Sequence, residues 1–158
     1  MTETNNKVTM VVFSGDMDKA MAAYIIATGA AASGMEVTMF FTFWGLQTLK
    51  KAAHTGSSFF GKMLGWMLKD INGVGPSKMN FGGMGRWMFK KMMGAKNVAT
   101  LPELRQMAIE LGVKFQACQM SMDVMEIRKK DLIDEVKDVV GVATMLEEAN
   151  HSKFTLFI

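Results

Sequence analysis

The chain has 158 residues and a net charge of +3, and 49% of its residues are hydrophobic while 21% are charged. This length and composition fit a single domain with a sizeable core and exclude a disordered chain, while two prolines and fifteen glycines exclude a collagen-like design. The net charge is small for a protein dedicated to nucleic acids, and the single cysteine, Cys118, excludes an intramolecular disulfide and a cysteine-based zinc site.

The first predicted elements form a strand–helix–strand unit. Residues 8–13 are apolar and rich in β-branched side chains, which is typical of a buried strand, and a turn follows over 14–16. An alanine-rich helix is predicted over 20–32 and a second buried strand over 36–43. Two strands joined by a helix of this length pair in parallel through a right-handed crossover, so the unit predicts an α/β fold.

The rest of the chain repeats this alternation after a short helix over 46–53 and an insertion over 55–97. The predicted elements are a helix over 101–111, a strand over 113–117, short helices that begin at 122 and at 130, a strand over 136–141, a helix over 142–150 and a strand over 154–158. We therefore expect one domain over residues 1–158. Its fold would be a single open, mainly parallel five-stranded sheet with flanking helices, the three-layer arrangement of flavodoxin-like and Rossmann-like proteins.

The insertion at residues 55–97 differs in composition from its flanks. Between residues 55 and 95 lie six basic residues and one acid, Asp70, with seven of the eighteen methionines and nine of the fifteen glycines. Aromatic residues and methionines gather around 59–67 and 84–93, with lysines between them. We favour a flap that packs on its own domain or on a neighbouring subunit, because the glycines weaken any long membrane helix. The alternatives are adsorption to an anionic membrane and docking on a partner.

The sequence pattern predicts a cytoplasmic protein. Residues 1–7 are polar and do not resemble a signal peptide, and the apolar run over 20–33 is shorter than the roughly 20 residues that a membrane-spanning helix needs. The lone cysteine fits a reducing compartment. Peripheral contact with the inner face of the membrane, through the insertion, is the alternative that the basic amphipathic pattern leaves open.

Cys118 is the strongest candidate for chemistry. An open parallel sheet places its functional groups in loops at the carboxyl ends of the strands, here residues 14–18, 43–46 and 118–122. Ser121 is expected to cap a helix beginning at Met122, which would direct backbone N–H groups toward the sulfur and favour the thiolate. The alternative is a buried, inert cysteine. The other loops supply the expected pocket walls, namely Ser14, Gly15, Trp44 and Gly45.

Other chemistries find little support in the residues. The two histidines, His54 and His151, lie far from Cys118 in sequence, and one cysteine with two histidines is too small a ligand set for zinc. The glycines at 83 and 85 begin a dinucleotide-binding pattern that lacks its third glycine and its preceding strand. We expect no metal, no cofactor and no nucleic-acid partner, and nucleotide or flavin binding is a third possibility.

Several motifs resemble those of the DsrE/DsrF-like family, and within it the DsrE2 branch. They span nearly the whole chain, at residues 13–20, 41–46, 77–85, 117–125, 141–143 and 156–158. The resemblance implies a sulfur-relay function, in which a cysteine carries sulfane sulfur as a persulfide or thiosulfonate alongside rhodanese-like and TusA-like partners. It also implies homo-oligomers, and it puts Cys118 at the sulfur-accepting position.

The lone cysteine limits what such a protein does. A carrier needs one accessible thiolate and no metal or base, but without a resolving cysteine Cys118 passes sulfur only to a partner's thiol. We therefore expect a sulfur carrier or sulfurtransferase that acts as a stoichiometric relay. The alternative is a non-catalytic module that docks on a protein or membrane through its basic, methionine-rich insertion.

Overall fold

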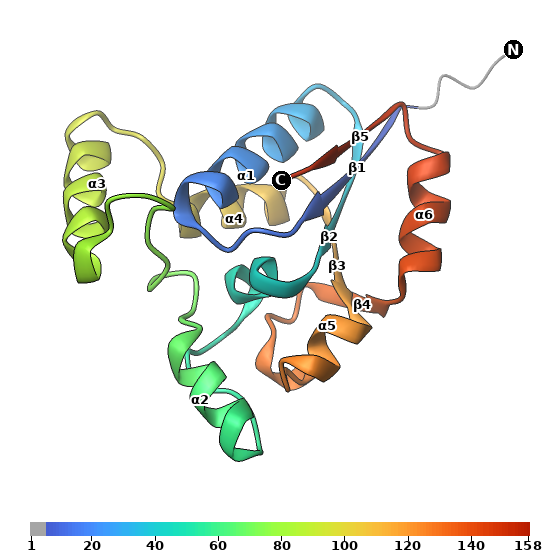
Figure 1. Cartoon of the computed structure of the whole chain (residues 1–158). Helices are drawn as coiled ribbons and strands as arrows, with labels where there is room; N and C mark the ends of the chain where they lie inside the picture. The colour runs from blue at the N-terminus through green and yellow to red at the C-terminus, as the bar shows by residue number, and fades with distance from the viewer. Residues whose placement is uncertain (1–5) are drawn as a thin grey trace, which may run out of the picture.

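The computed structural model describes residues 6–158, and five parallel strands form one sheet in the order β4–β3–β2–β1–β5 (Figure 1). The strands are β1 (Lys7–Val12), β2 (Glu36–Phe41), β3 (Lys114–Cys118), β4 (Val136–Val140) and β5 (Phe154–Phe157). The predicted α/β class, with its five-stranded parallel sheet and flanking helices, is confirmed.

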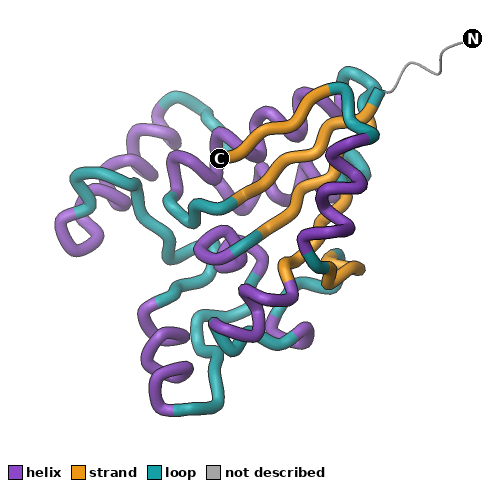
Figure 2. The backbone as a smooth tube through the Cα atoms, turned by 45° about the vertical axis from the view of Figure 1, so that its right-hand side comes forward, coloured by secondary structure: helices purple, strands orange, loops and turns teal. Residues whose placement is uncertain are grey.

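Helices cover the two faces of this sheet unequally. Helices α1 (Met17–Ala32) and α4 (Leu101–Glu110) pack side by side on one face, and α6 (Val142–Asn150) lies on the other (Figures 1 and 2). The chain adds β2, β3 and β4 in one direction from β1 and then returns to place β5 on the opposite edge. Right-handed crossovers in opposite directions put their helices on opposite faces, which explains why α6 is separate from the others.

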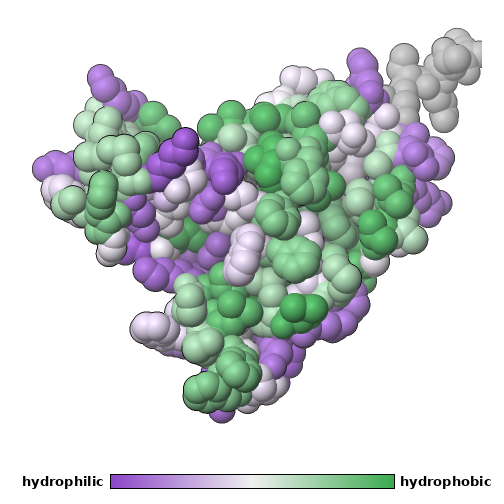
Figure 3. Space-filling view, viewed as in Figure 1, coloured by the Kyte–Doolittle hydropathy of each residue, from purple (hydrophilic) through white to green (hydrophobic). Residues whose placement is uncertain are grey.

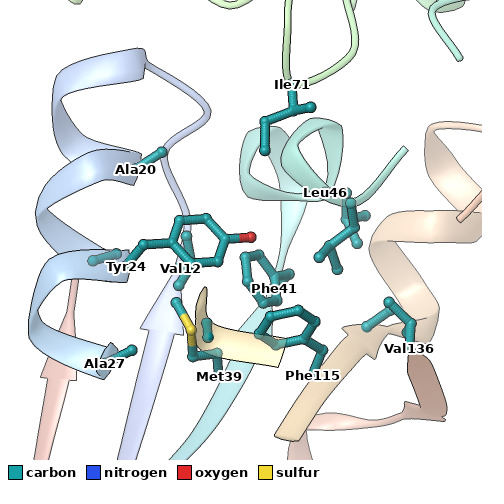
Figure 4. Close-up of a cluster of buried hydrophobic side chains, with 14 of the residues drawn as sticks. Val12, Ala20, Tyr24, Ala27, Met39, Phe41, Leu46, Ile71, Phe115 and Val136 are labelled. Carbon is teal, nitrogen blue, oxygen red and sulfur yellow. The ribbon is translucent and has the colours of Figure 1, made fainter. Parts of the chain in front are cut away.

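The main core lies between the sheet and the α1/α4 layer. Tyr24 of α1 packs on Phe41 and Phe115 with ring centroids 6.1 Å away in each case, and Phe41 and Phe115 meet edge to face at 5.6 Å (Figure 4). The small side chains of Ala20 and Ala27 on the same helix are fully buried and let α1 approach the strands closely. This packing holds the ends of β2 and β3 in fixed register.

The opposite face of the sheet is thinly covered. No residue of α6 is buried, and the ring of Phe13, just after β1, stacks on exposed Phe157 of β5 with centroids 5.8 Å apart. Gln116 of β3 lies on this face and is buried, yet its Oε1 accepts no hydrogen bond within residues 6–158. Parallel sheets are ordinarily covered on both faces, whereas this sheet leaves apolar surface exposed on the face of α6.

The segment after β2 differs from the predicted helix over 46–53. It forms a 3-10 helix, η1 (Phe43–Leu49), and residues 51–53 are irregular. Gly45 explains the early start, because its N–H donates to the carbonyl oxygens of Phe13 (2.9 Å) and Thr42 (3.1 Å) and draws the chain back along β1.

Three further helical elements lie between η1 and α4. They are α2 (Phe59–Met67), η2 (Phe81–Gly83) and α3 (Met84–Ala95), and both α2 and α3 project away from the sheet (Figures 1 and 2). Within residues 6–158, no helix combines the length and the apolar character needed to cross a membrane.

Hydrogen bonds connect this projecting region to the rest of the domain, which we call the body. The Glu126 carboxylate, in the loop after α5 (Gln119–Val124), accepts hydrogen bonds from the N–H and hydroxyl groups of Ser57 and Ser58 at the start of α2, and these donors lower its pKa to about 2. Asp18 of α1 accepts from the N–H (2.8 Å) and hydroxyl (2.6 Å) of Ser77. Buried Lys50 donates to the carbonyl oxygen of Leu68 at 2.7 Å. The stretch between α2 and α3 therefore packs on its own domain.

Candidate functional site

Cys118 ends β3 and is at once the N-cap of α5, which begins at Gln119. The helix thus starts three residues earlier than predicted, and the expectation that Ser121 caps it is wrong. Strand passes into helix here with no intervening turn, so Ser121 falls inside the first turn, where it is fully buried. Its hydroxyl points into the protein rather than toward the free end of the helix, as its contact with Thr42 shows.

Hydrogen-bond donors surround the thiol of Cys118. Burial raises the pKa of this thiol, whereas hydrogen bonding by the hydroxyl and N–H of Ser121, the hydroxyl of Thr42 and the N–H of Met120 lowers it. These donors outweigh burial, and the pKa of Cys118 lies below the ordinary value for a cysteine. The site therefore favours the thiolate, the form that acts as a nucleophile.

Thr42 belongs to this site, although no sequence pattern indicated it. The β2–β3 register pairs Phe41 with Ala117, so the next residues along, Thr42 and Cys118, face each other at the strand ends. The hydroxyls of Thr42 and Ser121 lie 2.8 Å apart, and the N–H of Thr42 donates to the carbonyl oxygen of Val12 at 3.0 Å. Thr42 thus connects β1, β2 and the start of α5. Only the register of two strands far apart in sequence reveals this pairing.

The other predicted site residues form a tightly packed junction between two loops. Ser14 is buried, and its hydroxyl donates to the Asp16 carboxylate at 3.2 Å. A Cβ on Gly15 would lie 2.3 Å from the carbonyl oxygen of Trp44, so the loop after β1 touches η1 there. The structure brings these residues together, and it links them to Cys118 and Ser121 through Thr42. Trp44 keeps an exposed side chain.

A polar hollow of about 250 Å³ lies where the loop after β1 meets the region between α2 and α3. Gly15 lines it, whereas Cys118, Ser121, Ser14, Trp44 and Gly45 do not. Its other polar lining residues include Asp16, Gln47, Lys69 and Asn80. The predicted pocket walls are therefore divided between this hollow and the close-packed loop junction.

Few side chains that could bind a metal or act as a general base lie near Cys118. Both histidines are exposed, and His151 Nδ1 is paired with the carbonyl oxygen of Glu147 at 2.8 Å. Among residues 6–158, no three histidine, cysteine, aspartate or glutamate side chains converge to hold a metal ion. What the site offers is a single thiol beside the hydroxyls of Ser121 and Thr42.

We expect Gly45→Ala to destabilise the fold by about 2–3 kcal/mol, which lowers the melting temperature by roughly 4–12 °C. A Cβ on Gly45 would lie 2.2 Å from the carbonyl oxygen of Val12, a backbone atom that cannot move aside cheaply. Thermal unfolding monitored by circular dichroism measures the change. Gly29→Ala in α1 is the matched control: its Cβ meets open space, so we expect a gain of about 0.5–1 kcal/mol. Equal stability of the two variants would contradict the close approach.

The chain is similar to known proteins in both sequence and fold. Residues 4–157 match the model of the DsrE/DsrF/DrsH-like family. The chain is 49% identical to the uncharacterized protein YrkE of Bacillus subtilis over the full length of both, and 36% identical to the sulfur carrier protein DsrE2 of Allochromatium vinosum, covering 96% of this chain and 98% of the relative. The fold resembles the ychN protein of E. coli with a TM-score of 0.56 at 9% identity, covering 96% of this chain and 98% of that one.

Proposed function

The chain belongs to the DsrE/DsrF/DrsH-like family, and we propose that it is a sulfur carrier that accepts sulfane sulfur on Cys118 and passes it to a partner's thiol. The observation that carries this proposal is the place of the chain's only cysteine at the end of β3, beside the paired hydroxyls of Ser121 and Thr42, whose hydrogen bonding lowers its pKa. The similarity to a protein named as a sulfur carrier supports it.

The transfer is a pair of thiol exchanges. The Cys118 thiolate attacks the outer sulfur of a donor persulfide, a new bond forms between Sγ and that sulfur, and the donor leaves as a thiolate. A donor carrying a thiosulfonate reacts at its sulfane sulfur in the same way, and the –S–SO₃⁻ group moves as a unit. An acceptor thiolate then attacks the sulfur bonded to Sγ, and Cys118 is released as a thiolate. Each step conserves electrons, so the carrier needs no oxidant or cofactor.

The site residues have distinct parts in this proposal. Ser121 and Thr42 orient and stabilise the sulfur, while the packed loops that hold Ser14, Gly15, Trp44 and Gly45 fix the position of Thr42. Cys118 is only 6% exposed, so a partner's reactive thiol must approach the end of β3 closely to reach its sulfur. Exposed Met120, two residues further along the chain, offers an apolar contact for that partner.

The partners we propose are rhodanese-like donors and TusA-like carriers. Both classes present a reactive cysteine, which is the chemistry that a chain with one cysteine requires, because it has no second thiol to resolve its own persulfide. The proposal assigns the chain to the cytoplasm, where a single thiol remains reduced and ready to accept sulfur.

We further propose that the chain assembles as a homo-oligomer through the thinly covered face of the sheet. Exposed Phe157 and the ring of Phe13 stacked on it would be covered by a second copy. Light scattering should give a mass that is a multiple of the single chain, and Phe157→Lys should reduce that mass to the monomer. A wild-type monomer at micromolar concentration would contradict the assembly.

Intact-mass spectrometry tests the carrier function. The purified chain is measured before and after incubation with a polysulfide or with a rhodanese previously loaded from thiosulfate. We expect a gain of one or more sulfur atoms that a reductant removes and that a TusA-like protein takes over. No adduct, together with slow alkylation of Cys118, would contradict the proposal and would favour a docking module instead.

A further inference from the structure

Helix α2 turns its bulky side chains away from the protein. Its two buried residues are Gly61 and Gly65, where a Cβ would lie 2.2 Å from Glu126 Oε2 and 2.1 Å from the carbonyl oxygen of Thr55. These close approaches fix which side of the helix meets the body. The opposite side therefore faces solvent, and it carries five large apolar side chains, Phe59, Phe60, Met63, Trp66 and Met67.

Helix α3 also exposes large apolar side chains, which lie around most of its circumference. Gly85 is its buried residue, and a Cβ there would lie 2.1 Å from the carbonyl oxygen of Met79. Arg86 donates to the carbonyl oxygen of Gly73 at 2.6 Å and so ties the helix to the body. Lys91 Nζ lies 5.3 Å from the centroid of the exposed Trp87 ring. The exposed apolar residues of α3 are Met84, Trp87, Met88, Phe89 and Met92.

The two helices form separate lobes. In Figure 3 a notch divides the lobe of α2, at the bottom of the view, from the lobe of α3 at the upper left, and hydrophobic residues cover much of the α2 lobe. Single exposed apolar residues are common on proteins, but ten on two short helices are not. A surface of this kind is covered by something when the protein functions.

The charge of this region identifies what covers it. Residues 55–95 hold six basic residues and only Asp70 as an acid. Two copies that met through these lobes would bring like charges together, which opposes self-association. The cores of protein interfaces are also depleted in lysine, whereas lysine beside tryptophan and phenylalanine is typical of segments that lie at the surface of an anionic bilayer.

We propose that α2 and α3 attach the protein peripherally to an anionic lipid surface. The aromatic and methionine side chains would enter the boundary between headgroups and acyl chains, while Lys62 and Lys91 would meet the lipid phosphates. A fluid bilayer accepts two separated lobes without a matching shape, which a folded partner would have to supply. This attachment goes beyond the carrier function and does not depend on it.

Vesicle binding by the full chain tests the attachment. Co-sedimentation should show binding to vesicles of phosphatidylcholine with phosphatidylglycerol, weaker binding as salt is raised, and little binding to phosphatidylcholine alone. The double variant Phe60→Ser/Trp66→Ser should weaken binding at least about tenfold, since each aromatic side chain loses its burial. Ile25→Ser, at an exposed position of α1, is the matched apolar control and should bind as the wild type does.

Charge and depth are tested separately. Lys62→Glu/Lys91→Glu should abolish the preference for anionic vesicles, whereas Lys137→Glu on exposed β4 should not. Lipids brominated on their acyl chains should quench the fluorescence of Trp66 and Trp87, so that Trp66→Phe and Trp87→Phe each lose part of the quenching and Trp44→Phe loses none. No binding to anionic vesicles at low salt would overturn the proposal. Unchanged binding by the aromatic double variant would also overturn it. So would a wild-type dimer in the absence of lipid that the double substitution converts to a monomer.

Discussion

The Cys118→Ser variant is expected to take up no sulfur from a polysulfide or from a loaded rhodanese, and to pass none to an acceptor. The reason is stoichiometric, because the chain has no other thiol and the serine hydroxyl does not attack sulfane sulfur at neutral pH. Intact mass before and after incubation measures the loss, which should be complete. A sulfur adduct on the variant that reductant removes would show that the load sits elsewhere and would exclude Cys118 as the acceptor.

The same variant should keep its fold, which separates chemistry from stability. A serine hydroxyl pairs with the hydroxyls of Ser121 and Thr42 much as the thiol does, and it is smaller than the sulfur it replaces. We expect melting temperatures within a few degrees of each other. Retained loading by Ser152→Ala, a serine variant between the end of α6 and the start of β5, would show that the loss is specific to Cys118.

The sequence predicts the sheet well because its signals are local. The apolar run before Ser14, the alanine-rich helix and the second buried run each predict their own element, and all three lie within three residues of the observed bounds. Chain order and handedness then constrain how the strands pair. The sequence does not indicate how little of its sheet face α6 covers, since the exposure of that face depends on what the whole sheet packs against.

The site is less predictable because its contacts join distant segments. Cys118 is recognisable as the only thiol, but the donors that surround it come from the end of β2 and from the interior of the first turn of α5. Ser121 looks like a helix cap by residue type, yet α5 begins three residues earlier and the hydroxyl serves Thr42 and the sulfur. A serine near a strand end is compatible with both roles, and only the backbone path decides between them.

The projecting helices show a third kind of limit. The sequence reveals the aromatic and methionine clusters and their lysines, but it does not tell whether those side chains pack inward. Gly61 and Gly65 decide the matter, because their close contacts with the Glu126 and Thr55 segments leave no room for a side chain on that side. Glycines four residues apart on a helix are therefore the local sign that the opposite face is the outer one.

Removing the donors around the sulfur should raise the pKa of Cys118 and slow its alkylation at neutral pH. Burial raises that pKa, while the hydroxyls of Ser121 and Thr42 and two N–H groups lower it. Ser121→Ala or Thr42→Val removes one of these donors, so the pKa of Cys118 should rise. A hydrogen bond to a charged group contributes about 1.5–3 kcal/mol, so each variant should react roughly tenfold more slowly at pH 7. The rate is measured with iodoacetamide across a pH series.

The pH profile distinguishes this effect from a change in access. Because the substitutions alter only the thiolate fraction, the rates of wild type and variants should converge well above the ordinary thiol pKa of about 8.5. Thr38→Val is the matched control, since Thr38 is a buried threonine on the same face of β2 but four residues away from Thr42. A variant rate that stays low at every pH would mean that these hydroxyls keep the sulfur reachable rather than ionised. An unchanged profile would remove both from the site, and with them the physical basis for a reactive Cys118.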